Sequence, residues 1–121
     1  MNDKLFRFED LGIWKEGMRI SGNLFQIARV AELRHNYALS DQLKRAAISI
    51  TNNIAEGSGS TSKKDFHHFL TMSRRSLYEC ANLMVLYEQQ GLIGAERKIQ
   101  MMSELSVLGK MITNFQKSLR Q

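Results

Sequence analysis

Two groups of polar residues could do chemistry together. Residues 42–57 have helical periodicity, and their polar side chains fall within an arc of about 80° on that helix: Gln42, Arg45, Ser49, Asn53 and Glu56. Ser76 and Glu79, about one turn apart on a later helical segment, extend the set. Paired carboxylates could act as general acid and base. An arginine with carboxylates and amides inside a bundle more often holds helix register, so we interpret all seven residues as a structural polar network.

Other reactive residue types lack the spacing of known sites. His67 and His68 are adjacent, so on a helix their rings point about 100° apart and cannot hold one metal ion together. The single cysteine, Cys80, falls on an apolar helix face, and no C-x-x-C or H-E-x-x-H pattern occurs. The Gly/Ser stretch before Lys63 and Lys64 departs from the Walker spacing, although a helix start with two lysines could hold an anion. We therefore expect no catalytic residue, metal site or cofactor, and a protein that is not an enzyme.

Three short interruptions divide the chain into four helical segments. The predicted helices span about residues 10–31, 40–56, 63–90 and 95–119. Ser40 and Asp41 are expected to cap the second helix, and Gly57 to end it in the left-handed conformation. Near-heptad apolar spacing and short connections predict an all-α, antiparallel up-down-up-down four-helix bundle, forming a single domain over residues 1–121.

The first predicted helix carries two apolar rows, displaced from each other by about 100°. We assign to the bundle core the row Trp14, Met18, Ser21, Phe25 and Ala28. A monomer rarely exposes a contiguous apolar patch, so we expect an oligomer interface made of the second row and three further residues: Ile13, Ile20, Leu24, Ile27, Ile48, Phe69 and Met72. A single wide core stripe is the alternative.

The chain is basic, with 17 Lys and Arg against 12 Asp and Glu, and a formal net charge of +5. Residues 61–121 carry nine of these cations and five of the anions. A surface of this kind can bind a polyanion, and the candidate contacts are Lys63, Lys64, Arg74, Arg75, Lys110 and Lys117. No apolar run is long enough for a membrane span, and a lone cysteine with no apolar signal segment favours the cytoplasm.

Several segments resemble one known family. Phe8-Glu9-Asp10-Leu11 with Ile13-Trp14, the run from Gln42 to Gly57, and Ser76-Leu77-Tyr78-Glu79 are similar to the four-helix-bundle proteins encoded in intervening sequences of bacterial 23S rRNA genes. Thr51 stands where that family usually has proline, Ser60 where a basic residue is common, and Arg75 where a small residue is frequent. The resemblance implies a cytoplasmic bacterial protein that forms a homopentamer. The chain is also similar to accessory proteins of diversity-generating retroelements, basic bundles that bind nucleic acid and a reverse transcriptase.

We therefore expect a non-enzymatic, oligomeric accessory protein that binds RNA or DNA through phosphate contacts on a basic surface. The alternative is a protein-interaction scaffold with no nucleic-acid role, whose basic surface meets an acidic protein partner or maintains solubility.

Overall fold

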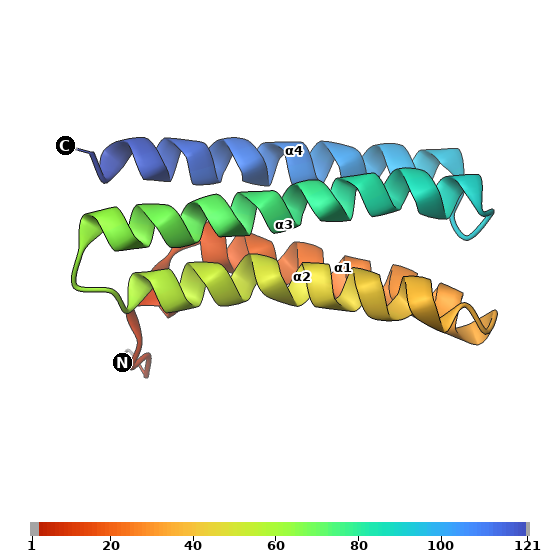
Figure 1. The fold of residues 1–121 in the computed structure, drawn as a ribbon, viewed down its shortest axis with the longest axis horizontal. Coiled ribbons are helices and arrows are strands. Elements are labelled where there is room, and N and C mark those ends of the chain that lie inside the picture. The colour runs from red at the N-terminus through yellow and green to blue at the C-terminus, as the bar shows by residue number, and fades with distance from the viewer. Residues whose placement is uncertain (1–2, 121) are drawn as a thin grey trace.

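The computed structural model describes residues 3–120, and those residues form a bundle of four long helices. The helices are α1 (Gly12–Leu33), α2 (Tyr37–Ser58), α3 (Lys63–Gln89) and α4 (Ala95–Ser118), preceded by the 3₁₀ turn η1 (Arg7–Asp10). Figure 1 shows that each helix runs opposite to the one before it, so α1 begins at the end of the bundle where α4 finishes. The predicted all-α four-helix bundle is confirmed. The outer limits of the expected domain, residues 1–2 and 121, lie outside the described residues.

The middle helices bury the apolar stripes that their spacing predicts. The buried residues of α2 include Leu43, Ala46, Ala47, Ile50 and Ile54. Those of α3 include Phe66, Leu70, Ser73, Leu77, Cys80, Met84 and Tyr87. At the far end of this core the Tyr87 hydroxyl donates a 2.7 Å hydrogen bond to the Leu39 carbonyl oxygen, which links α3 to the first turn of α2.

On α1, the row expected at an oligomer interface is the more deeply buried of the two apolar rows. Ile13, Ile20, Leu24 and Ile27 are at most 4% exposed because they face the core of their own chain. Their assignment to an oligomer interface is therefore wrong. From the row expected in the core, Ser21 and Ala28 are buried, whereas Met18 and Phe25 are 48% and 39% exposed.

Small residues explain this rotation of α1. The Ser21 hydroxyl donates to the Ala47 carbonyl oxygen of α2, and a Cβ atom added at Gly17 would lie 3.0 Å from Thr51 Cγ2. Gly17 and Ser21 therefore form the line of closest approach between α1 and α2. The larger Met18 and Phe25 are directed outward.

Two predictions for the ends of α2 are also wrong. The helix begins at Tyr37, three residues before the predicted start, because the Asn36 side chain accepts a hydrogen bond from the Leu39 amide and caps it. The preceding turn places His35 at φ +62°. At the other end Gly57 lies within the helix and has no positive φ. A Cβ atom there would lie 2.7 Å from Phe69 Cβ and 2.8 Å from Phe66 Cδ1, so Gly57 allows α2 and α3 to approach closely.

The other connections follow the expected chemistry. The Ser62 side chain accepts a hydrogen bond from the Asp65 amide and caps α3. Gly91 adopts φ +71° just after α3, a conformation that glycine takes without steric cost.

Candidate nucleic-acid interface

A groove runs along the surface between α3 and α4. Near one end, the Gln116 side-chain amide donates hydrogen bonds to the His67 carbonyl oxygen (3.0 Å) and the Thr71 hydroxyl (2.9 Å). Further along, Gly109 leaves room for the Leu77 side chain, whose Cδ2 would lie 3.7 Å from a Cβ atom at Gly109. Beside this contact a cavity of about 460 Å³ opens between the two helices. Its volume is within the range of small-ligand sites, about 300–1,000 Å³.

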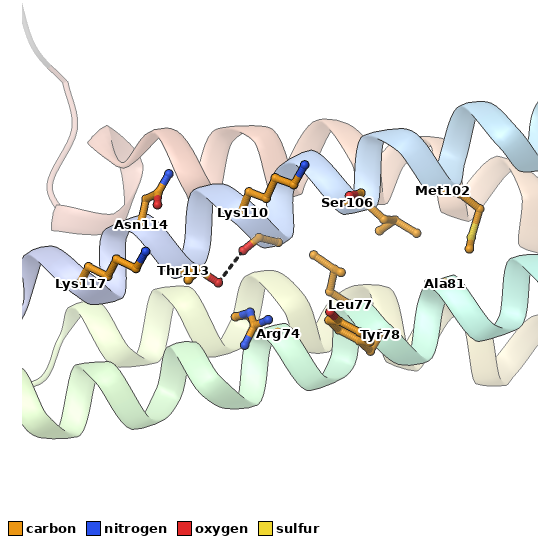
Figure 2. Close-up of a pocket in the computed structure, with 12 residues that line it drawn as sticks. Arg74, Leu77, Tyr78, Ala81, Met102, Ser106, Lys110, Thr113, Asn114 and Lys117 are labelled. Carbon is orange, nitrogen blue, oxygen red and sulfur yellow. Dashed lines mark hydrogen bonds between the residues drawn. The ribbon is translucent and has the colours of Figure 1, made fainter.

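Cationic and neutral polar side chains border this groove, and apolar side chains line the rest of it. Figure 2 shows Arg74 and Tyr78 on α3 across from Lys110, Thr113 and Lys117 on α4. Leu77, Ala81, Met102 and Leu105 contribute the apolar part. Among the described residues no Asp or Glu lines the groove. The groove is therefore an amphipathic site with a positive border.

A second cavity extends this surface over the outer side of α3. It is lined by Thr71, Arg74, Arg75 and Tyr78, so the two cavities share Arg74 and Tyr78. We call the surface formed by Arg74, Arg75, Tyr78, Lys110 and Lys117 the α3–α4 cationic face. Four of the six predicted cationic residues gather on it.

The other two cations lie at the start of α3. Lys64 and Arg75 are eleven residues apart, which is close to three helical turns, so they share a side of α3 at a distance of roughly 16 Å. Lys63 is the first residue of the helix. Lys64 thus extends the track of positive charge along α3, whereas Lys63 lies at its end.

Two carboxylates of α3 and α4 pair with cations outside this face. Glu104 faces α1, where its Oε1 lies 2.6 Å from Arg19 Nη2, and Glu88 pairs with Lys98 at 3.4 Å. Within residues 3–120, the ion pairs found use none of the four cations of the α3–α4 cationic face. Arg74 Nε is buried and has no hydrogen-bond partner in this part of the chain. The positive charge of the face is therefore available to a ligand.

The predicted polar network exists in part, across the α2–α3 interface. The Ser49 and Ser76 hydroxyls share a 2.7 Å hydrogen bond, and the Asn53 amide donates to the Ser49 carbonyl oxygen and hydroxyl at 2.8 and 3.0 Å. The Gln42 amide also donates to Glu79 Oε2. Five of the seven residues thus connect or support these two helices.

The remaining two predicted members of that network do not join it. Arg45 and Glu56 are exposed on α2, and neither makes a hydrogen bond or ion pair with the described residues. The prediction that Arg45 and Glu56 belong to the polar network is therefore wrong. The polar arc of α2 is wider than its contact with α3, so these two side chains lie on the solvent side of the helix. The structure therefore does not bring Glu56 to Glu79 or to Arg45 as a catalytic group.

Other groups with possible chemistry are dispersed. In the described region, no three His, Cys, Asp or Glu residues gather as metal ligands. Burial raises the pKa of the Cys80 thiol to about 12, with a smaller effect from the Glu79 charge, so the thiolate is disfavoured. No described helix is long and apolar enough to cross a membrane.

Of the residues proposed for an oligomer interface, those outside α1 remain accessible. Ile48 is 44% exposed, and Phe69 and Met72 are half-buried. Ile48 follows Ala47 on α2, and the Ala47 carbonyl oxygen accepts a hydrogen bond from Ser21 on α1. Ile48 is therefore close to the level of Met18 and Phe25, which lie within one or two turns of Ser21. We define the α1–α2 apolar face as the exposed residues Met18, Phe25 and Ile48; other exposed apolar residues of the described chain lie elsewhere, among them Val85 on α3 and Val107 on α4.

The chain is similar to known proteins in both sequence and fold. Residues 9–114 match the model of the 23S rRNA-intervening sequence protein family. The chain belongs to that family. The chain is also similar to a crystal structure from Bacteroides thetaiotaomicron, described as a protein with unknown function from the S23 ribosomal protein family. The likeness has a TM-score of 0.81 at 17% identity and covers 87% of this chain and 98% of that chain, so it shows the fold alone. No curated protein matches the chain.

One member of the α3–α4 cationic face, Tyr78, is not among the residues predicted from the sequence to contact nucleic acid. Its ring lies against Arg74, with Arg74 Cζ 5.7 Å from the ring centroid. The four-residue spacing of Arg74 and Tyr78 on one helix was the available signal. That spacing does not indicate which helix lies opposite them.

Proposed function

We propose that this protein is a non-enzymatic, oligomeric accessory protein that binds RNA or another nucleic acid through the α3–α4 cationic face. One observation carries the proposal: Arg74, Arg75, Lys110 and Lys117 line two adjoining cavities that have no acidic lining, and they form no ion pair among the described residues. Phosphate groups of the nucleic acid would pair with these four cations. The release of counterions from the nucleic acid would then drive binding.

The arrangement favours contact with the nucleic-acid backbone over sequence reading. Two of the four cations are lysines, which act as flexible point charges, and they extend from a single face of α4. Phosphate contacts position a nucleic acid without carrying sequence information. We therefore expect binding that depends strongly on salt and weakly on base sequence.

The test is a salt titration with a fluorescently labelled RNA. With four phosphate contacts to a single strand, the slope of log K against log salt concentration is about −3, so affinity falls roughly 50-fold between 50 and 200 mM salt. The double substitution Lys110→Ala/Lys117→Ala removes two contacts and reduces the slope to about −1.5.

A matched control removes the same charge elsewhere. Lys15→Ala/Arg29→Ala takes two exposed cations from α1, outside the α3–α4 cationic face, and is expected to keep the slope of the original protein. Salt-independent binding, or equal effects of the two double variants, would contradict the proposal.

Association of several copies is part of the proposal. The α1–α2 apolar face offers exposed side chains that a second copy could cover, and the family resemblance supports a homopentamer. A closed ring would repeat the α3–α4 cationic face in every copy and raise its avidity for a long polyanion. The buried free thiol of Cys80 supports a reducing compartment, the cytoplasm.

The second candidate function is a protein-interaction scaffold, which the α1–α2 apolar face favours. In that case, a purified complex would contain one stoichiometric protein partner that survives nuclease treatment. Substitution of Ile48 by Glu would release this partner, while Lys110→Ala/Lys117→Ala would not.

A further inference from the structure

An exposed aromatic ring lies in the middle of the α3–α4 cationic face. Tyr78 is 64% exposed and lines both cavities of that face. The guanidinium of Arg74, one turn earlier on α3, lies over the ring, with Cζ 5.7 Å from the centroid. Figure 2 shows Tyr78 beside Leu77, on the side of α3 that faces α4.

The surroundings of this ring suit a flat, partly apolar group with negative charges next to it. Leu77, Ala81 and Met102 provide apolar contacts along the groove. Arg75 lines the second cavity together with Tyr78, and Lys110 and Lys117 lie on the opposite helix (Figure 2). Lys110 and Lys117 are two turns apart on α4, roughly 10 Å along its axis. A nucleotide has the matching chemistry, since its base is flat and apolar on its faces and its phosphate is anionic.

Only an unpaired base can reach such a ring. In a duplex the faces of the bases are covered by their neighbours, and a protein contacts mainly phosphates and base edges. Single strands expose base faces, and proteins that bind them combine a positive groove with aromatic side chains on which bases stack.

We propose that the α3–α4 groove binds single-stranded nucleic acid, with one unpaired base stacked on Tyr78 and flanking phosphates held by Arg75, Lys110 and Lys117. The inference rests on the function proposed above and specifies its ligand. Charge on this face attracts any nucleic acid, and the Tyr78 ring selects the single-stranded form.

The experiment uses the full chain and two labelled probes, a 12-nucleotide adenine-rich RNA strand and the 12-base-pair duplex that contains it. Fluorescence anisotropy measures each affinity at several salt concentrations. Tyr78→Ala is expected to weaken binding of the single strand by about 5- to 150-fold, without changing its salt slope and without weakening the duplex. Tyr78→Phe keeps the ring and is expected to bind the single strand within about twofold of the original protein.

Tyr78→Leu separates stacking from simple apolar contact. Leucine keeps apolar volume but has no flat face, so its affinity for the single strand is expected to fall close to that of Tyr78→Ala. Because Tyr78 is exposed, these variants are expected to keep the helical circular dichroism of the original protein. If Tyr78→Ala loses this signal, the comparison of Tyr78→Leu with Tyr78→Phe tests the stacking contact in its place.

The outcomes separate the two proposals. Binding of both probes with a normal salt slope and no effect of Tyr78→Ala overturns the stacking inference alone. An equal loss for strand and duplex overturns it as well. If neither probe binds at 50 mM salt, the nucleic-acid function itself is overturned.

Discussion

The close contact of α2 and α3 at Gly57 predicts an unusual effect of a single methyl group. Within a helix, replacing glycine by alanine normally stabilises a protein by about 0.5–1 kcal/mol. At Gly57, however, the new Cβ atom would lie 2.7 Å from Phe69 Cβ and 2.8 Å from Phe66 Cδ1. Phe66 is 1% exposed, so its ring is enclosed by neighbouring side chains and cannot turn away into solvent. We therefore expect Gly57→Ala to destabilise the bundle.

The matched control is Gly22→Ala on α1. A Cβ atom at Gly22 meets nothing within 4 Å, so this variant reports helix propensity alone. Forcing a methyl group into a packed contact costs about 1–3 kcal/mol, and the difference in unfolding free energy between the two variants is expected to be at least of that size.

Urea unfolding followed by far-ultraviolet circular dichroism measures this difference. All proteins are compared at one protein concentration, because association of copies would make stability depend on it. Gly22→Ala should unfold at a higher urea concentration than the original protein, and Gly57→Ala at a lower one. Equal midpoints for the two variants would refute the close-packing role of Gly57.

The remaining predictions concern buried polar groups. Tyr87→Phe removes the hydrogen bond to the Leu39 carbonyl oxygen and should lower the free energy of unfolding by about 0.5–1.5 kcal/mol in thermal or urea unfolding. Burial raises the pKa of both Tyr87 and Cys80 to about 12, from ordinary values of 10.0 and 9.0, so the unfolded chain loses these protons first. Stability should therefore be unaffected by these groups below pH 9 and fall between pH 9 and 12, and a constant urea midpoint over that range would contradict this. The Cys80 thiol should react with Ellman's reagent at pH 8 only after urea unfolds the chain, and rapid reaction of the folded protein would show that it is accessible. Arg19→Ala leaves the Glu104 carboxylate, 17% exposed, without its cation, so it should destabilise the protein more than Arg29→Ala does in the same unfolding assay.

The helices and most of their buried stripes could be predicted from sequence because each depends on local periodicity. α2 and α3 each carry one dominant apolar stripe, which identifies the buried side directly. On α1 two apolar rows lie about 100° apart, and periodicity alone does not distinguish the side that faces the bundle. Gly17 and Ser21 decided the rotation by allowing close approach to α2, an effect that depends on Thr51 and Ala47 in another helix.

Gly57 illustrates the same limit. A glycine near a helix end is typical of a left-handed cap, and that local rule predicted its role wrongly. Its partners, Phe66 and Phe69, lie beyond the next connection and come into contact only when α2 and α3 pack.

The candidate site depends on tertiary structure in a similar way. The sequence identified Arg74, Arg75, Lys110 and Lys117 as cations. Their gathering on one face follows from the antiparallel packing of α3 and α4 (Figure 1). Lys64 contributes from further along α3, at roughly three turns from Arg75.

The most direct test of the nucleic-acid function is lysine footprinting with and without RNA. The full chain is treated with an amine-reactive acetylating reagent at low salt, and mass spectrometry measures the modification rate of each lysine. If RNA binds the α3–α4 cationic face, it should slow the modification of Lys110 and Lys117 and leave that of exposed Lys15 on α1 unchanged. If RNA binds while Lys110 and Lys117 react as fast as in its absence, the ligand lies elsewhere and the α3–α4 cationic face is not the binding site.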